Sequence, residues 1–373
     1  MLKEIIKYFF SIGTLTFGGP LAIIDAIRKD VVLKKKWIDS NEFENIIGYS
    51  QIAPGAYAYQ VAMYVGYNLA KMPGALLAGF FLVLPSFLLM LILSFFYSNY
   101  KDINYIQYAI YGIAPVITAI ITHSGINLMF TLLKKDLFLY ILFFASIFLT
   151  IFFNVQIIYI IIASAFISLI YYTIIYKNRI LSLFPALLMI FLLFKNYTNA
   201  SLDKLALLFI KIGALTYGSG FVIVGVLRQE VVDNFHWLTS KEFLDGLILG
   251  QITPGPVVIT STFIGYITSG IPGAIVATIS IFLPTTIFVL IIAKYIYKIR
   301  NYFYIKALIK GANAGALGAI ISTAYFIAMD SINDYFTIGF LLSAFLILSL
   351  TKIKPIFLII FFGLLGVLIK IIM

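Results

Sequence analysis

The sequence predicts an all-α polytopic membrane protein: an inverted repeat of two six-helix units with broken or re-entrant helices. Three observations support this fold class. The chain is 62% hydrophobic and 11% charged, whereas a soluble domain carries about 25% charged residues. Apolar runs long enough to cross a bilayer follow one another along the whole chain. The first half of the chain also reappears in the second half at a nearly constant offset.

The two halves of the chain match at their glycines, prolines and other distinctive residues. Residues 9–55 match residues 209–255 at an offset of 200, and after the loss of one residue the match continues at an offset of 199. The matched pairs include Gly13/Gly213, Gly18/Gly218, Arg28/Arg228, Trp37/Trp237, Gln51/Gln251, Pro54/Pro254, Gly55/Gly255, Gly66/Gly265, Gly74/Gly273, Pro85/Pro284 and Gly112/Gly311. Such a duplication in an apolar chain, with interruptions at corresponding places, is typical of secondary transporters whose substrate site lies between the repeats.

The apolar runs fall into two sets. A helix needs about 20 apolar residues to span a bilayer. In the first membrane repeat, residues 1–176, spans are predicted at 4–27, 44–70, 73–98, 105–132, 137–153 and 155–176. In the second, residues 200–373, they are predicted at 202–227, 243–268, 271–297, 305–329, 336–350 and 355–373. One further apolar segment, 180–194, forms a linking span within residues 177–199. About thirteen spans result, and the unpaired linking span would turn the second repeat upside down.

Basic residues indicate the orientation of the chain, because lysine and arginine favour the cytoplasmic side of a membrane protein. A cytoplasmic N-terminus places most of the basic residues between spans inside and the C-terminus outside. One loop breaks the rule, since Arg28, Lys29 and the run Lys34 to Lys36 would face outward. Two explanations stay open: either the first segment is re-entrant and does not cross, or this loop has a role that competes with topology.

The first segment of each repeat is interrupted by helix-breaking residues. Gly18-Gly19-Pro20 lies about two-thirds of the way along the first apolar stretch, where proline removes an amide donor and glycine disfavours a helix. A break at membrane depth is tolerated where it lines a cavity or is buried in protein. A helix that begins there directs free N–H groups into the cavity, which favours an anion. The corresponding break is Gly218-Ser219-Gly220. The alternative is a plain kink that allows close helix packing.

A second pair of breaks brings glutamine to each interruption. The segments are Gln51-Ile52-Ala53-Pro54-Gly55 and Gln251-Ile252-Thr253-Pro254-Gly255-Pro256. Each belongs to a stretch longer than one span requires, so it is either a bent span or a hairpin that enters and returns. A buried glutamine amide needs hydrogen-bond partners, which an oxyanion or the unwound backbone itself could supply. These residues are therefore candidates for the substrate site, with bonding to the broken helix as the alternative.

Three basic side chains are candidates for contact with an anion. Arg28 and Arg228 follow the first break by about two turns, and the planar donor fork of arginine fits tetrahedral oxyanions. The alternative is that they anchor the chain at the membrane interface beside Trp37 and Trp237. Lys211 lies within an apolar run, where an unpaired charge is costly. It is either a fixed counter-charge for an anion or a side chain that snorkels toward the interface.

Other kinds of site find little support in the sequence. The chain has no cysteine, and His123 and His236 have no companions at metal-ligand spacing, so neither a metal nor another cofactor is predicted. The net charge of +11 comes from short basic stretches between apolar runs, which indicate topology and not nucleic-acid binding. No motif of a membrane-embedded enzyme is present. One span carries small residues on neighbouring faces, which predicts close packing of that span against other helices: Gly311, Gly315 and Gly318.

Several of these motifs together resemble the chromate ion transporter family, in its two-repeat form, over nearly the full length of the chain. The residues that carry the resemblance are Phe17-Gly18-Gly19-Pro20, Arg28 to Val32, Trp37 with Glu42-Phe43, Gln51 to Gly55, Trp237-Leu238-Thr239-Ser240 and Gly250 to Pro256. Two places depart from the family pattern. Ala56 stands where a second proline is usual, and Tyr217 and Ser219 stand where Phe and Gly are common.

The resemblance implies an inner-membrane permease with antiparallel halves that expels chromate, with sulfate as a further candidate substrate and the proton gradient as the energy source. The residues do not distinguish chromate from sulfate, because the two anions share shape and charge. The alternatives are a transporter of a different anion or small organic acid, a passive channel or scaffold, and a membrane-embedded enzyme. Assembly into a homo-oligomer stays open.

Overall fold

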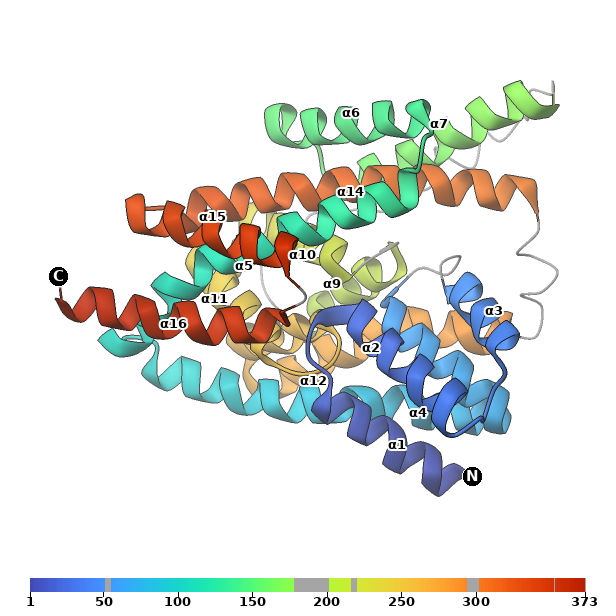
Figure 1. Ribbon diagram of the computed structural model, residues 1–373, viewed down its shortest axis with the longest axis horizontal. Helices are drawn as coiled ribbons and strands as arrows, with labels where there is room; N and C mark the ends of the chain where they lie inside the picture. Colours follow the sequence, from blue (N-terminus) through green and yellow to red (C-terminus); the bar gives the residue numbers. More distant parts are fainter. Residues whose placement is uncertain (51–54, 178–200, 216–219, 294–301, 352, 373) are drawn as a thin grey trace.

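The computed structural model describes residues 1–373 apart from 51–54, 178–200, 216–219, 294–301, 352 and 373, and every secondary-structure element in the described part is a helix (Figure 1). The elements of the first repeat are α1 (Leu2–Leu15), α2 (Gly19–Arg28), the π-helix η1 (Lys29–Lys34), α3 (Ser40–Ser50), α4 (Tyr57–Tyr100), α5 (Asn104–Leu133), α6 (Leu137–Phe153) and α7 (Ile157–Lys177). Those of the second repeat are α9 (Leu202–Leu215), α10 (Gly220–Arg228), the π-helix η2 (Gln229–Asn234), α11 (Ser240–Ile252), the 3₁₀-helix η3 (Val257–Ile259), α12 (Thr260–Ile292), α14 (Phe303–Ser331), α15 (Tyr335–Leu350) and α16 (Pro355–Ile372). The predicted linking span 180–194 lies outside the described residues.

Six described helical segments are long and apolar enough to cross a membrane. They are α4, α5, α7, η3 with α12, α14 and α16, and two shorter apolar helices, α6 and α15, accompany them. The all-helical membrane class is therefore confirmed, while the number of about thirteen spans stays a prediction. The helix bounds lie within a few residues of the predicted ones because apolar runs and their Gly, Pro and polar ends are local features of the sequence.

The first segment enters the protein and returns. α1 has 14 residues and is roughly 21 Å long, shorter than the ~30 Å hydrocarbon core of a bilayer. It ends where Thr16 is extended and Gly18 is left-handed (φ 111°). The Trp37 ring, which follows α2 and η1, then packs edge-on against the Tyr8 ring in the middle of α1, at a centroid distance of 5.4 Å. α1 and α2 thus form a hairpin (Figure 1), and the basic loop Arg28 to Lys36 lies at the same end as the N-terminus.

The second segment is also a hairpin, formed by α3 and the first part of α4. The helix α4 is non-helical at Ala70 and Lys71, which divides it into a first arm, residues 57–69, and a second arm, residues 72–100. At the end of the first arm, Asn68 Nδ2 donates to Glu42 Oε1 in the first turn of α3 at 2.9 Å. The chain has therefore returned to the level at which α3 began. α12 has the same interruption at Ser269 and Gly270.

Glycines matched between the repeats make equivalent helix contacts. A Cβ on Gly13 of α1 would lie 2.3 Å from the Leu82 carbonyl oxygen of α4, and one on Gly213 of α9 would lie 2.2 Å from that of Ile281 in α12. Any side chain would clash with the facing backbone at these distances. A Cβ on Gly311 of α14 would likewise lie 2.1 Å from the Ser164 carbonyl oxygen of α7.

The close packing predicted for the glycines of α14 is confirmed. Gly315 faces Ser164 Oγ of α7 at 2.8 Å, and Gly318 faces Ser146 Cβ of α6 at 2.5 Å, both measured from an ideal Cβ. The repeats also interlock: α14 of the second packs on α6 and α7 of the first, and α5 of the first packs on α15 and α16 of the second.

Candidate functional site

The tips of the hairpins from the two repeats meet inside the protein. The Gly255 N–H, in the second-repeat break, donates to the Thr16 carbonyl oxygen in the first-repeat break at 3.1 Å. Ser86 Oγ, in the second arm of α4, donates to the Pro254 carbonyl oxygen at 2.6 Å. Backbone groups that the break in one repeat leaves free are therefore hydrogen-bonded to groups of the other repeat. Both breaks lie at the junction between the repeats.

Each Pro-Gly tip sits against a hydroxyl of the opposite repeat. A Cβ on Gly255 would lie 2.1 Å from Ser86 Oγ, and one on Gly55 would lie 1.8 Å from Thr285 Oγ1. Ser86 and Thr285 correspond at the offset of 199, and each follows a matched proline. Both glycines also have positive φ, 116° at Gly55 and 99° at Gly255, a conformation that residues with a side chain rarely adopt. Glycine is needed at both tips for conformation and for space.

The break at the start of α2 is present as the sequence predicted. Gly18 is the left-handed N-cap of α2, Pro20 lies in its first turn, and no side chain caps the helix. An ideal Cβ on Gly19 would meet nothing within 4 Å, so there is open space beside the first turn of α2, although Gly19 itself is buried. The role of these residues in binding stays a prediction. In the second repeat α10 begins at Gly220.

Some predicted site residues cannot be placed. Gln51, Pro54, Gly218 and Ser219 lie outside the described residues. Pro256 is described and buried, immediately before η3.

Polar atoms near the tips are buried without a hydrogen bond to any described residue. They are Gln251 Nε2 at the C-terminal end of α11, Ser50 Oγ at the end of α3 and Thr285 Oγ1 against Gly55. A buried polar atom without a partner is costly and is explained by water or a ligand. Gln251 was predicted as a site residue. Ser50, Ser86 and Thr285 were not, although the matched prolines before the last two marked their positions.

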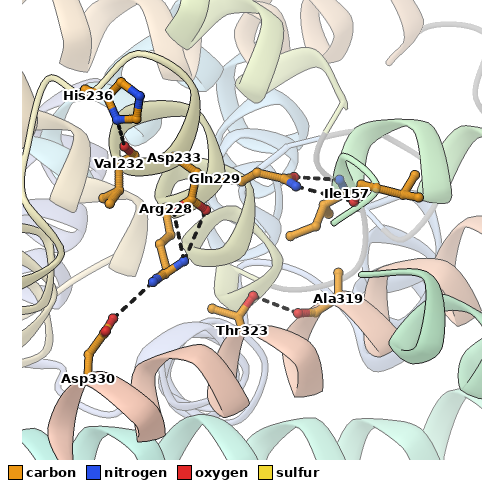
Figure 2. A network of polar contacts seen from close by, with 10 residues as sticks. Ile157, Arg228, Gln229, Val232, Asp233, His236, Ala319, Thr323 and Asp330 are labelled. Carbon is orange, nitrogen blue, oxygen red and sulfur yellow. Dashed lines mark hydrogen bonds and ion pairs between the residues drawn. The ribbon is translucent and has the colours of Figure 1, made fainter. Parts of the chain in front are cut away.

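Arg228 is held in a network that joins three elements (Figure 2). Its Nη1 lies 3.1 Å from Asp233 Oδ2 in η2, and its Nη2 lies 3.1 Å from Asp330 Oδ2 near the end of α14. The guanidinium also lies over the Phe326 ring, 5.1 Å from its centroid. Burial raises the pKa of Asp233 and the Asp330 carboxylate adds to this, although Arg228 acts in the opposite direction. The Arg228 guanidinium is thus paired with two carboxylates within the protein.

The residue next to Arg228 extends the network to α7. The Gln229 side chain accepts from the Ile157 N–H at 2.7 Å through Oε1 (Figure 2). It also donates to the Val155 carbonyl oxygen at 3.3 Å through Nε2. Gln229 therefore satisfies a free amide at the start of α7 and ties η2 to the first repeat.

Arg28 and Lys211 have simpler surroundings. Arg28 Nη2 pairs with Glu44 Oε1 at 2.9 Å, and both side chains are more than half exposed. Lys211 Nζ pairs with Glu230 Oε1 at 2.7 Å, with the lysine 18% and the glutamate 5% exposed. The Lys211 charge is therefore already compensated inside the protein by a buried carboxylate.

Comparison with known proteins identifies the family. A family model for chromate transporters matches residues 3–169 and 204–367. The chain is 32% identical over 337 residues to the chromate transport protein of Cupriavidus metallidurans, covering 89% of this chain and 84% of that protein. It is 32% identical over 338 residues to a probable chromate transport protein of Synechococcus elongatus, with coverage of 89% and 86%.

A third relative comes from an archaeon. The chain is 32% identical over 302 residues to an uncharacterized transporter of Methanocaldococcus jannaschii, covering 77% of this chain and 74% of that protein. No solved structure matches the chain. The two family-model matches coincide with the two sequence repeats, and the apolar helices suit a bilayer. The chain is therefore an integral plasma-membrane protein that belongs to the chromate transporter family.

Proposed function

We propose that this protein is a secondary active transporter that carries an oxyanion of the chromate class out of the cell, with the anion bound where the hairpin tips of the two repeats meet. The observation that carries the proposal is the hydrogen bond from Gly255 to Thr16, because it joins a break of one repeat to a break of the other. Binding between repeats at broken helices is the arrangement typical of secondary transporters. The relatives named for chromate transport support the choice of anion.

The chemistry of the tips suits an oxyanion. α2 begins at an uncapped glycine, so its first N–H groups and the positive end of its dipole are available to an anion. Gln251 Nε2 is a buried donor without a partner among the described residues, and the Ser50 hydroxyl is likewise buried without a partner among them. Neutral donors of this kind bind an anion without leaving a fixed positive charge behind when it departs.

An inverted arrangement of the repeats is supported by the second arm of α4, residues 72–100, which is roughly 40 Å long. At its beginning lies the open end of the first-repeat hairpin, where Asn68 contacts Glu42. At its other end, Lys101 Nζ pairs at 3.1 Å with Glu242 Oε1, at the open end of the α11 hairpin of the second repeat. The two hairpins thus enter from opposite ends of one long helix, which would expose the tips alternately to the two sides.

The test is binding and flux with purified protein. In detergent, chromate and sulfate should each raise the melting temperature, because a ligand that binds the folded state stabilises it; molybdate and phosphate serve as comparisons. In proteoliposomes, the protein should move the stabilising anion, and the flux should respond to an imposed pH gradient. Absence of flux for every one of these oxyanions, by protein that is correctly folded, would remove the proposal.

A matched pair of variants locates the binding site. Gln251→Leu removes the tip amide that has no hydrogen-bond partner among the described residues, and we expect it to lose both the thermal shift and the flux. Gly339→Ala is the control, because an ideal Cβ on Gly339 of α15 meets nothing within 4 Å. If Gln251→Leu binds and transports as well as Gly339→Ala does, the tip does not bind the anion.

A further inference from the structure

A buried acid lies away from the tips, in a groove between the repeats. Asp245, in the middle of α11, is 2% exposed. It borders a cavity of about 580 Å³ between α4, α5 and α11, lined otherwise by apolar and aromatic side chains such as Phe96, Ile106 and Ile248. Tyr97 Oη donates to Asp245 Oδ2 at 2.7 Å. Asp245 Oδ1 is buried and has no hydrogen-bond partner among the described residues.

The charged groups around Asp245 make their direct contacts with other residues, and Lys241, Glu242 and Lys101 act on Asp245 only through longer-range electrostatics. Lys101, at the end of α4, pairs with Glu242, one turn before Asp245 on α11. Lys241 Nζ donates to Gln107 Oε1 of α5 at 3.2 Å. On α16, the charged side chain is Lys370, which lies over the Tyr111 ring at 4.4 Å from its centroid. Within the described part of the chain, no ion pair balances a charge on Asp245.

A lone carboxylate in such a place is costly to bury, and protonation removes the charge. We propose that Asp245 is the proton-binding site that couples anion transport to the proton gradient; this inference rests on the proposed function. In the binding step, one proton adds to Asp245 Oδ1 while the Tyr97 O–H continues to donate to Oδ2. Release returns the same proton to water. No other bond forms or breaks.

The position of Asp245 connects the proton to both solvent and substrate. The Lys101–Glu242 pair lies one turn toward the open end of the hairpin and is partly exposed, with 40% and 23% of the two side chains accessible. In the other direction, Gln251 lies six residues along the same helix, roughly 9 Å away at ~1.5 Å per residue. A change of charge on Asp245 therefore alters the free energy of the arm that carries the tip.

The first repeat provides the matched substitution. At the offset of 200, Asp245 corresponds to Asn45, whose Nδ2 donates to Glu42 Oε2 at 3.3 Å. The chain thus already uses the neutral isostere at the equivalent place in an equivalent hairpin. Asp245→Asn keeps the shape of the side chain and an acceptor for Tyr97, and removes the ability to bind and release a proton. The second repeat would carry the coupling proton alone.

The experiment separates exchange from coupled transport. Proteoliposomes containing Asp245→Asn are measured first for chromate or sulfate exchange without a gradient, and then for net flux driven by an imposed pH gradient. We expect exchange to persist and the response to the pH gradient to be lost. Asp102→Asn, at an exposed acid just beyond the end of α4, should keep both activities.

Each result is decisive. Normal gradient-driven flux in Asp245→Asn overturns the inference and leaves the proposed function intact, whereas absence of oxyanion flux in the unmodified protein contradicts the proposed function instead. If Asp245→Asn does not fold, Tyr97→Phe replaces it. Removing the donor to the carboxylate should move the midpoint of the flux–pH profile to higher pH, because the charged form is the one that loses stabilisation. An unmoved midpoint overturns the inference.

Discussion

Arg28 and Arg228 occupy corresponding positions in the two repeats, yet their surroundings differ. The Arg28 side chain is 52% exposed and contacts one glutamate that is itself exposed. The Arg228 side chain is 11% exposed and lies between Asp233 and Asp330. Both arginines come immediately before a π-helix, an uncommon element that is often found at functional sites. The backbone of the two repeats has been kept at this place, while the polar contacts have changed.

The difference teaches which part of a duplicated fold is constrained. Contacts that rest on backbone proximity, such as Gly13 on Leu82 and Gly213 on Ile281, are the same in both repeats. Contacts between charged side chains are not, and Lys211 with Glu230 has no equivalent because Ser11 replaces the lysine. Polar side chains at the end of α10 and the start of η2 contact α14 and the start of α7, whereas Arg28 contacts α3 of its own repeat. We therefore expect the two repeats to respond unequally when a charged residue is replaced, and alike when a matched glycine is replaced.

The largest expected effect concerns topology and is all-or-none. The chain has no cysteine, so single cysteines can be labelled without background. Lys3→Cys and Lys36→Cys should react with an impermeant reagent from the same side, because α1 and α2 form a hairpin. Asp102→Cys and Lys241→Cys should react only from the opposite side.

Labelling of Lys3→Cys and Lys36→Cys from opposite sides would show that the first segment crosses, as the simple span count implies. A membrane-permeant reagent that labels all four variants is the control for cysteine accessibility.

Gly255→Ala should abolish most of the transport. The new Cβ would meet Ser86 Oγ at 2.1 Å, an overlap that costs about 1–3 kcal/mol. The positive φ of Gly255 adds about 1–2 kcal/mol for any residue with a side chain. Flux in proteoliposomes measures the loss, with Gly339→Ala as the control.

Gly55→Ala should behave in the same way against Thr285, so equal losses would show that the tips are functionally equivalent. Adding Ser86→Ala to Gly255→Ala removes the closest clash and should recover part of the flux. If Gly255→Ala transports normally, the tip has room that the structure does not indicate.

Arg228→Gln should lower the thermal stability by a large amount. The substitution leaves Asp233 and Asp330 near each other without their shared cation, and removing one partner of a buried ion pair costs about 3–5 kcal/mol when burial is complete. Because the two aspartates are 31% and 28% exposed, we expect somewhat less, about 2–3 kcal/mol. The melting temperature in detergent measures the effect.

Adding Asp233→Asn to Arg228→Gln should recover part of this loss, since one of the uncompensated charges is removed. A melting temperature that stays at the wild-type value in Arg228→Gln would contradict the role of the network in holding η2 to α14.

Much of this architecture could be predicted from local sequence features, and the remainder depends on distant contacts. Apolar length placed the helices, and the glycine and proline pairs placed the breaks. Whether a segment crosses or returns depends on contacts such as Tyr8 with Trp37, which no local pattern encodes.

The candidate site shows the same division. Gln251 could be proposed as a candidate from its place beside a break, but the partner of Arg228 in α14 lies 102 residues away along the chain. The partner of Lys211 lies on a π-helix whose residues have no distinctive pattern. The sequence left open whether Lys211 faced an anion, and the ion pair with Glu230 could not have been foreseen from spacing alone.

Lys211→Met tests whether the second repeat depends on a charge pair that the first lacks. Glu230 would remain 5% exposed without its cation, and we expect a loss of about 2 kcal/mol, with Asn234 still donating to its other oxygen at 3.2 Å. The melting temperature measures this loss. Lys211→Met combined with Glu230→Gln should be close to wild type, because both charges are then absent. A double variant that is less stable than the single one would contradict this explanation.

Arg28→Gln should have the smallest effect on stability, under ~1 kcal/mol, because its pair with Glu44 is exposed to solvent. Its effect on transport separates two roles. If Arg28 attracts the anion from solution, the substitution should raise the anion concentration needed for half-maximal flux and leave the maximal flux unchanged. The difference between the variant and the wild type should then become smaller as salt is added. Lys29→Gln, which breaks the neighbouring pair with Asp25, is the control for a general change of surface charge. Equal effects of the two variants would mean that Arg28 contributes only its positive charge. The exposed arginine of the first repeat would then have no specific role comparable to that of the buried Arg228 in the second.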